Sequence, residues 1–406
     1  MNDNDVVIVM GVRTPFSPFG GAMRDVPSID LGAMVMKELL LRTGLKGEYI
    51  DEVFYGMTMH SEAALYDNSC GRQALLKAGL PPETVSLTID RACCSSMAAA
   101  ILAFRTIKAG EGEVFIAGGA ENMSHSPQIA PPELRWGTRL GPITLRDPMS
   151  PLGHTWIAGP EAQNAGEVAL EYGVTREEQD LWAYQSQMRY QEAFKAGKYK
   201  IGEELMIVEV PQRKGAALIV DKDLFPKPET TIESLAKLKT VYSSPTVTAG
   251  NAPGLDTGAS GVVIMRRSKA KEFGLLPLAT ILATASVCTP PRFLAVNPGF
   301  AMNKLVKKAG VSIDAIDLFE INEAFAAVPL VSSKILGDGD DSRMRRIRGK
   351  LNVNGGAISI GHPVGASGAR LIMTLMYELR RRGGGLGAAG ICGGISQGDS
   401  VLIKVD

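Results

Sequence analysis

Apolar runs alternate with stretches of helical periodicity along the first 120 residues of the chain. Residues 6–10 are all apolar, which predicts a strand buried on both faces. A helix is predicted from Ser28, because apolar residues recur at helical spacing and Ser28-Ile-Asp30 would cap the first turn. The same signals predict strands at 51–56, 85–89 and 113–117, and helices at 70–78 and up to residue 108. This alternation predicts a mostly parallel sheet covered by helices.

The regular alternation stops between about residues 124 and 243, where prolines and glycines are frequent and a helix is predicted at 175–196. Core-like signals return at 246–265 and end in a buried strand. We therefore predict an N-terminal half formed by residues 1–120 plus 245–270, and a C-terminal half formed by residues 271–406. Residues 121–244 would be an inserted loop domain that selects the substrate.

The second half of the chain repeats the order of elements in the first. The segment from Ile316 resembles the segment from Ile50, and residues 387–394 resemble residues 114–120. Cys93 follows Ile50 at nearly the distance at which His362 follows Ile316. The chain is therefore predicted to contain two copies of one α/β unit, whose corresponding turns could meet at a shared site.

These two turns carry the strongest candidates for chemistry. His362, one of four histidines, lies in a glycine-rich turn just before a helix predicted at 365–379. Cys93 lies between a strand and a helix, where unpaired backbone N–H groups and the helix dipole stabilise a thiolate. The adjacent Cys94 is interpreted as structural. Both turns offer small residues around a reactive side chain, as close approach of a substrate requires.

Composition limits the classes of function. Forty-three basic and forty-three acidic side chains cancel, so no global charge favours nucleic acid or an anionic membrane. The basic cluster at 343–348 is interpreted as a solvated surface, and no apolar run suggests a membrane span. The N-terminus has no targeting pattern, so we expect a cytoplasmic protein. Five cysteines without metal-type spacing are expected to be free thiols.

Several sequence blocks resemble those of one known family. They lie in order over nearly the whole chain, at residues 119–124, 213–215, 235–239, 247–251, 322–325 and 354–370. Together they resemble the signature blocks of thiolases, the acetyl-CoA C-acyltransferases. The resemblance implies an α/β thiolase fold, in which duplicated βαβαβαββ halves form five layers (α-β-α-β-α) with an inserted loop domain.

The resemblance also implies catalytic roles. Cys93 would be the nucleophile that accepts the acyl group of a 3-oxoacyl-CoA, and His362 would take its proton. Cys392 would protonate the departing acetyl-CoA enolate, or abstract the α proton in the reverse condensation. One oxyanion hole would combine His362 with Asn322 through a water, and the other would use the backbone N–H groups of Cys93 and Gly394. Two cysteines and one histidine at turns independently suit a reaction that needs a nucleophile and a separate acid/base.

Coenzyme A would be a substrate, and no metal or prosthetic group is implied. Residues with which we expect CoA or the acyl chain to interact are Met123, Met149, Trp156, Arg213, Lys214, Ala249, Gly250, Pro253 and Phe325, with Arg135 as a further acyl-pocket candidate. The family pattern is broken at Asp90, Ser96, Pro253, 256–257 and 395–396, and Glu161-Ala-Gln-Asn-Ala-Gly-Glu167 replaces a usual Met-Gly-Xaa-Thr-Ala-Glu-Asn. We therefore expect an acyl group larger than that of acetoacetyl-CoA, or one that is aromatic or carboxylated.

Alternative functions remain open. Acetoacetyl-CoA could be the substrate after all, and the direction of the reaction cannot be read from the sequence. A decarboxylating ketosynthase shares the fold but lacks a second catalytic cysteine, so Cys392 and Asn322 favour a thiolase. A non-catalytic thiolase-fold subunit or lipid carrier would be favoured by loss of these residues, and a papain-like hydrolase has no local signature here. We expect a homodimer or homotetramer, with an accessory subunit as an option, and no nucleic acid or membrane partner.

Overall fold

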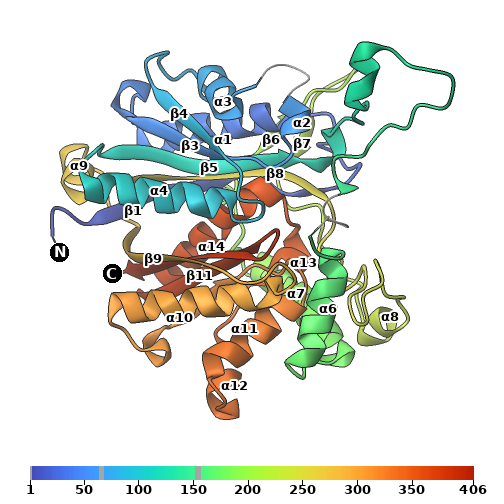
Figure 1. Cartoon of the computed structure of the whole chain (residues 1–406). Coiled ribbons are helices and arrows are strands. Elements are labelled where there is room, and N and C mark those ends of the chain that lie inside the picture. Colours follow the sequence, from blue (N-terminus) through green and yellow to red (C-terminus); the bar gives the residue numbers. More distant parts are fainter. Residues whose placement is uncertain (1, 64–67, 151–156) are drawn as a thin grey trace.

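The computed structural model describes residues 2–63, 68–150 and 157–406 (Figure 1). The strands that belong to the first half are β1 (Val6–Arg13), β2 (Ser17–Pro18), β3 (Glu52–Gly56), β4 (Val85–Ile89), β5 (Val114–Asn122) and β8 (Asp256–Arg266). Those of the second half are β9 (Ala279–Cys288), β10 (Leu318–Ile321), β11 (Gly385–Gly393) and β12 (Gln397–Val405). Among the described residues they form one ten-stranded sheet in the order β10-β11-β12-β9-β1-β8-β5-β3-β4, with β2 beside β8.

The prediction of a mostly parallel sheet was wrong. Only the pairs β3–β4, β3–β5 and β10–β11 are parallel, whereas the pairs that involve β8, β9 and β12 are antiparallel. Helices cover both faces of these antiparallel strands, so they too contain apolar runs, such as residues 262–265 of β8 and 401–403 of β12. An apolar run indicates that a strand is buried on both faces, but it does not indicate whether the strand is parallel or antiparallel to its neighbours.

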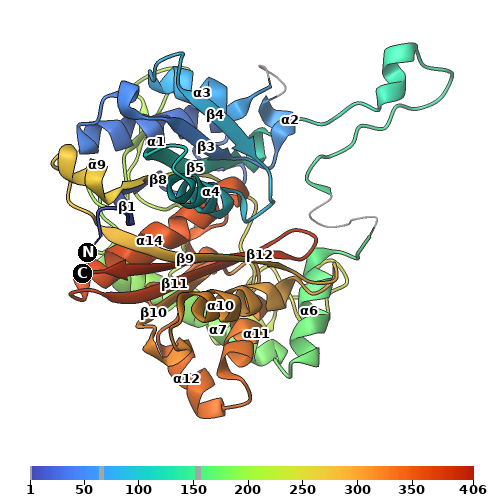
Figure 2. The ribbon, with the colours of Figure 1, turned by 60° about the vertical axis from the view of Figure 1, so that its left-hand side comes forward.

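Five layers of helices and sheet are stacked in Figures 1 and 2, as predicted. Helices α1 (Ser28–Thr43) and α3 (Cys70–Ala78) cover the outer face of the first half, and α10 (Asn297–Ala309) and α11 (Ala327–Gly337) cover that of the second. Helices α4 (Ser95–Ala109) and α14 (Ser367–Arg381) form the central layer. The apolar core accordingly lies in three large clusters, one in the centre and one under each outer layer.

The two central helices approach each other closely. A Cβ atom at Gly368 of α14 would lie 2.3 Å from the backbone nitrogen of Met97 in α4. The hydroxyl of Ser96 accepts a hydrogen bond of 3.0 Å from the backbone N–H of Ala369. The segment 92–109 is long and apolar enough to cross a membrane by length and composition, and it is mostly buried in this central layer. Its apolar character is what a core helix requires.

Two details of the first half differ from the predictions. Ser28 does not cap α1, since the N-cap residue is Pro27 and the carboxylate of Glu62 accepts hydrogen bonds from both the backbone N–H and the hydroxyl of Ser28. Strand β5 continues to Asn122, past the two glycines that were expected to end it. A Cβ atom at Gly119 would lie 2.3 Å from the carbonyl oxygens of Gly56 and Gly365, so glycine is needed inside this strand.

The insertion contains α6 (Glu161–Glu171), α7 (Arg176–Lys195), the hairpin β6 (Val208–Val210) and β7 (Leu218–Val220), and α8 (Ile232–Ala236). It begins with an arm that projects from the body of the molecule (Figure 2). Buried Arg13 of β1 fastens the rest of the insertion to the core, because its guanidinium lies 2.5 Å from the Glu204 carboxylate and 2.7 Å from that of Asp223. Short helices complete the chain: α2 (His60–Ala63), α9 (Arg267–Glu272), α12 (Asp341–Gly349) and α13 (Ala357–Ile360). The exact three-part domain division stays a prediction.

Candidate active site

Cys93 lies in the turn that joins β4 to α4. The turn is sharp because Ala92 adopts a left-handed backbone conformation with φ of +46°. The hydroxyl of Ser95 closes the turn, since it accepts a 2.9 Å hydrogen bond from the N–H of Arg91 and donates one of 2.6 Å to the carbonyl of Ala92. Cys93 is buried, and within the described residues its thiol has no hydrogen-bond partner. The thiol is thus held in place by the backbone alone.

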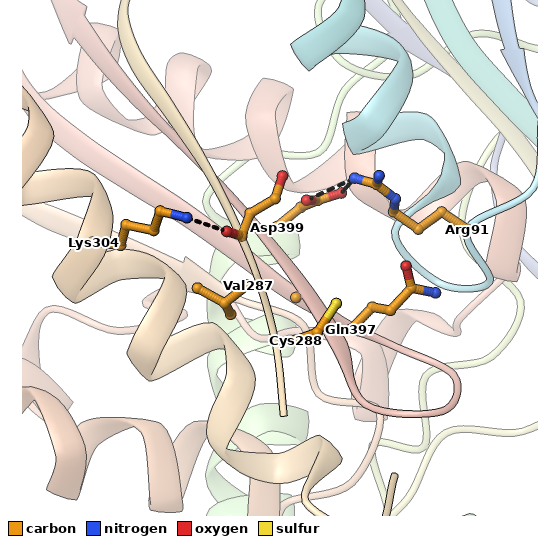
Figure 3. A pocket seen from close by; sticks show the side chains of 8 residues that line it. Arg91, Val287, Cys288, Lys304, Gln397 and Asp399 are labelled. Atoms are coloured by element: carbon orange, nitrogen blue, oxygen red, sulfur yellow. Dashed lines mark hydrogen bonds and ion pairs between the residues drawn. The ribbon is translucent and has the colours of Figure 1, made fainter. Parts of the chain in front are cut away.

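The opposite half of the molecule fixes this turn. Arg91 donates two hydrogen bonds of 3.1 Å to the carboxylate oxygens of Asp399 on β12 (Figure 3). The pair borders a pocket whose other lining residues include Cys288 and Lys304. None of the predicted catalytic residues lines this pocket, so it lies beside the predicted site and outside it.

His362 lies in the corresponding turn before α14. Gly361 has a φ of +103°, and the N–H of His362 donates a 2.6 Å hydrogen bond to the carboxylate of Asp256 at the start of β8. Nδ1 of the imidazole lies 2.5 Å from the hydroxyl oxygen of Ser367, which itself donates to the carbonyl of Pro363 at 2.8 Å. We therefore assign the imidazole proton to Nδ1, which leaves Nε2 with a free electron pair.

The imidazole of His362 is unprotonated in the resting site. Burial, reinforced by the positive charge of Arg370, lowers the pKa of His362 to about 3, so the imidazole is neutral at physiological pH. The amide nitrogen of Asn322, which follows β10, lies 3.3 Å from Nε2. The amide oxygen of Asn322 is buried without a hydrogen-bond partner among the described residues. The structure thus brings the predicted pair of His362 and Asn322 into direct contact.

Cys392 approaches from the end of β11. A Cβ atom at the next residue, Gly393, would lie 2.9 Å from the carbonyl oxygen of Arg91 and 3.0 Å from the sulfur of Cys94. A Cβ atom at Gly394 would lie 3.1 Å from that of Ala92. The end of β11 therefore packs directly on the Cys93 turn, and it places the backbone of Gly394 beside the nucleophile.

Both thiols are protonated in the resting site. Burial raises the pKa of Cys392 to about 12, with a further contribution from the charge of Glu161. Burial also raises the pKa of Cys93 well above its ordinary value, and the nearby Cys392 and Glu161 charges act in the same direction. Neither cysteine is a ready-made thiolate, so a reaction at Cys93 needs a neighbouring base.

Three acidic residues of the site were not predicted. Glu121 on β5 accepts hydrogen bonds from the N–H groups of Thr58, Met59 and Gly365, and burial raises its pKa to about 8. Asp256 holds His362, and Glu161 lies next to Gly394. The sequence signals were that Glu121 lies in the 119–124 block and that the chain departs from the family pattern at Asp256 and Glu161.

Glu323 lies in the 322–325 block next to Asn322. Its side chain is fully buried and joins three elements. Its carboxylate accepts hydrogen bonds from Trp182 at 3.0 Å, from Ser186 at 2.8 Å and from Asn352 at 2.9 Å. Glu323 therefore fastens helix α7 of the insertion to the strand end that carries Asn322.

The residues predicted to bind the acyl chain are only partly assembled. Met123 is buried in the central apolar cluster that contains Cys93, and the partly buried Met149 packs against it. Phe325 packs against the cluster that contains Cys392. Trp156 lies outside the described residues. Arg135 is exposed on the projecting arm, and no contact connects it with the cysteines.

The residues predicted to bind CoA lie on loops. Ala249 is exposed, and a Cβ atom at Gly250 would lie 2.5 Å from side-chain atoms of Leu235 and Leu238, so Gly250 packs closely against these two leucines. Pro253 is partly buried. Arg213 and Lys214 are exposed in the loop between β6 and β7. Among the described residues, no contact connects these two cations with the turns of Cys93 and His362, so their role stays a prediction.

Comparisons with known proteins cover nearly the whole chain. Residues 6–268 match the family described as "Thiolase, N-terminal domain" and residues 275–405 match "Thiolase, C-terminal domain". An acetyl-CoA acetyltransferase of Chromobacterium violaceum is 42% identical over 98% of this chain and 99% of its own. A beta-ketoadipyl-CoA thiolase of Pseudomonas aeruginosa is 39% identical over 98% of this chain and 99% of its own.

Solved structures show the same likeness. The Bacillus anthracis acetyl-CoA acetyltransferase superposes with a TM-score of 0.92 and 36% identity, and covers 99% of both chains. The human mitochondrial 3-ketoacyl-CoA thiolase in complex with CoA gives a TM-score of 0.90 at 36% identity, over 99% of this chain and 98% of its own.

Proposed function

Because this chain belongs to the thiolase family of acyltransferases, we propose that Cys93 takes the acyl group of a 3-oxoacyl-CoA and passes it to a second CoA molecule. The observation that carries the proposal is the meeting of three chain segments. The end of β11 with Cys392 and Gly394 packs on the Cys93 turn, and α4 and α14 join the Cys93 and His362 turns through Ser96 and Ala369.

In the first half of the proposed reaction, Nε2 of His362 takes the proton of Cys93 and the thiolate attacks the 3-oxo carbon. The bond between C2 and C3 then breaks, and its electron pair leaves with acetyl-CoA as an enolate. Cys392 donates its proton to C2 of this enolate. The raised pKa of Cys392 suits this role, because a thiol that holds its proton at neutral pH is an available acid.

In the second half, Cys392 as a thiolate takes the proton of an incoming CoA thiol. The CoA sulfur attacks the thioester carbon on Cys93, and acyl-CoA leaves. The sulfur of Cys93 recovers its proton from His362, so every group returns to its starting state. The same residues in reverse order catalyse the condensation, and the chemistry fixes neither direction.

A negatively charged oxygen develops in each half of the reaction, and we propose a separate set of hydrogen-bond donors for each oxygen. Asn322 and His362 stabilise the oxygen of the first half, since protonation by Cys93 turns Nε2 of His362 from an acceptor into a donor. The backbone N–H groups of Cys93 and Gly394 serve the second. The packing of Gly394 against Ala92 supports this pairing, because it brings the backbone of Gly394 close to the turn that carries Cys93.

We propose CoA as the substrate that enters and leaves, which the CoA complex of the human relative supports. We further propose that the acyl group is bulkier than acetyl. Pro253 lacks an N–H for a ligand, and Ile395 is 50% exposed in a left-handed conformation next to Gly394. Acetoacetyl-CoA is the second candidate, because relatives about 40% identical are named acetyl-CoA acetyltransferases.

A cytoplasmic homodimer or homotetramer is also proposed. Strand β4 is the outer edge of the sheet, and Val85 and Leu87 on it are 58% and 45% exposed. Edge strands with exposed apolar side chains are usually covered by a partner. A molecular mass measured in solution by light scattering would test this, and a monomer at micromolar concentration would contradict it.

The activity is tested by CoA-dependent cleavage of 3-oxoacyl-CoA esters with short, long, branched, aromatic and carboxylated acyl chains. Loss of the ester would be followed for the intact chain, Cys93→Ala and Cys392→Ala, with Cys94→Ala and Cys288→Ala as controls. We expect at least one ester to be cleaved, and both site variants to lose that activity while the controls keep it. Equal activity in Cys93→Ala would contradict the proposed nucleophile.

A further inference from the structure

Glu161 is an ionisable group in the active site that the proposed reaction does not use. It is the first residue of α6 and is partly buried. Its Oε1 lies 3.2 Å from the position that a Cβ atom would take at Gly394. Its charge raises the pKa of both Cys93 and Cys392, which places the carboxylate within electrostatic reach of both sulfur atoms.

The carboxyl group of Glu161 has no partner. Within the described residues it forms no hydrogen bond and no ion pair, and burial raises its pKa to about 7. The two other buried glutamates near the site are satisfied, since Glu121 accepts three backbone N–H groups and Glu323 accepts four donors. A carboxylate without donors is unfavourable where it is removed from water, and none of the described residues donates to this one. A bound molecule is one source of such a donor.

The position of Glu161 indicates which part of a bound molecule would supply that donor. In the acyl-enzyme, the acyl carbon is bonded to Sγ of Cys93 and its oxygen faces the N–H of Gly394. The first carbons of the acyl chain must therefore lie next to Gly394, where the Glu161 carboxyl group also lies. A donor on the acyl chain a few carbons from the thioester can reach this carboxyl group.

We propose that Glu161 selects 3-oxoacyl-CoA substrates whose acyl chain carries a hydrogen-bond donor, a hydroxyl or an ammonium group, near the reacting carbonyl, and that it rejects chains with a carboxylate at that position. The inference rests on the proposed thiolase function and narrows its substrate class. A site built to pair with a donor discriminates strongly against analogues that lack it, because the polar group of the protein is then left unpaired. A carboxylate would add the repulsion of a like charge.

The test compares esters that differ only at the end of the acyl chain. Four 3-oxoacyl-CoA esters with six-carbon acyl chains would carry a methyl, hydroxyl, ammonium or carboxylate terminus. Each would be assayed for kcat/KM with the intact chain, Glu161→Gln and Glu161→Met. Glu167→Gln on the same helix is the matched control, because Glu167 is occupied by a 2.8 Å hydrogen bond from Gln163.

With the intact chain we expect the hydroxyl and ammonium esters to exceed the methyl ester at least tenfold, and the carboxylate ester to be the poorest. Glu161→Gln should keep the preference for hydroxyl and lose that for ammonium, so the two donor types are told apart. Glu161→Met should lose both preferences and cleave the carboxylate ester at least tenfold better. Glu167→Gln should rank the esters as the intact chain does.

A second readout does not depend on cleavage. Alkylation of Cys93 by iodoacetamide reports its thiolate, and loss of the Glu161 charge should move the pH profile of alkylation to lower pH in Glu161→Gln and Glu161→Met. An unchanged ester ranking in Glu161→Met, with the methyl ester still cleaved, would overturn the role of Glu161 and leave the thiolase function intact. Failure of the intact chain to cleave every ester, including those of the broader panel, would overturn both.

Discussion

The turns of Cys93 and His362 occupy equivalent places in the two halves of the chain, but they restrain their reactive side chains to different extents. Each is fastened by a carboxylate of the other half, because Asp399 holds Arg91 and Asp256 holds His362. The imidazole of His362 is in contact at both nitrogens, whereas the described structure gives the thiol of Cys93 no partner. His362, the proposed base, is thus fixed, and Cys93, the proposed nucleophile, is unrestrained. In the proposed reaction the sulfur forms a bond to carbon and breaks it again, while the imidazole only holds a proton.

Replacement of the unrestrained partner should have the largest effect. Cys93→Ala removes the covalent intermediate, and we expect kcat to fall about 10⁴-fold or more. Mass spectrometry of the chain mixed with substrate, without CoA, should find the acyl group on Cys93. Cys94→Ala should still form it, since Cys94 faces the carbonyl of Ile391 at 3.6 Å. An acyl group on any other residue would refute the assignment.

Replacement of the fixed base should be nearly as severe. In His362→Gln the thiol of Cys93 loses its proton acceptor, and we expect kcat to fall roughly 10²- to 10⁴-fold. The acyl group should then form slowly on an otherwise intact Cys93. Rapid formation in a stopped-flow measurement would show that another group takes the proton.

The same substitution tests burial of the imidazole through pH. The pKa of His362 is lowered from 6.5 to about 3 on folding, so between these values the unfolded chain binds a proton that the folded chain does not. The free energy of unfolding should therefore fall with decreasing pH, by about 1.4 kcal/mol per pH unit from this group. Denaturant titrations at several pH values give the free energy of unfolding as a function of pH. The slope of this plot for the intact chain should exceed that for His362→Gln by this amount. Equal slopes would mean that His362 is accessible to protons.

Loss of the amide of Asn322, which lies beside Nε2 of the imidazole, should reduce activity less than loss of His362. Asn322→Ala removes the amide that lies 3.3 Å from Nε2 and that is proposed to stabilise the first oxyanion. We expect kcat to fall about 10²- to 10³-fold with little change in KM, as for removal of one oxyanion-hole donor. Steady-state kinetics on the best ester would measure it. A rise in KM at constant kcat would assign Asn322 to binding instead.

The smallest effect is expected where the two turns are joined. Ser96→Ala leaves the N–H of Ala369 without its acceptor between the central helices, which should lower the free energy of unfolding by about 1–3 kcal/mol. We expect kcat to change little.

Ser95→Ala is the comparison variant for Ser96→Ala. Ser95 closes the Cys93 turn itself, so its loss should lower kcat. If both variants behaved alike in thermal unfolding and kinetics, the two hydroxyls would not have separate roles.

Much of the fold was predictable because local patterns determine it. The bounds of α3 at 70–78 and β4 at 85–89 agree with the prediction, since capping glycines and apolar runs mark them in the chain. Strand direction was not predictable, because antiparallel strands covered on both faces have the same composition as parallel ones. The end of β5 was missed because Gly118 and Gly119 serve a close approach by residues distant in sequence.

Some residues of the candidate site could likewise be predicted from local sequence, and others could not. Cys93, His362 and Cys392 could be found because each lies in a small-residue turn, and the thiolase family that their blocks indicated is confirmed. The carboxylates of Glu121, Asp256 and Glu161 could not be assigned, since the groups that lie beside them come from other strands, turns and helices. Their functions depend on which turns the fold brings to them, and no spacing along the chain encodes that.

Strand β1 has a consequence for how the molecule is made. Its residues Val6, Val7 and Ile8 pair with β8 on one side and with residues 279–281 of β9 on the other, so a strand that is translated before both of its neighbours is central in the finished sheet. Neither neighbour exists until most of the chain has been translated. Strand β1 therefore remains unpaired until β8 has been synthesised, and its second neighbour is added only when β9 follows.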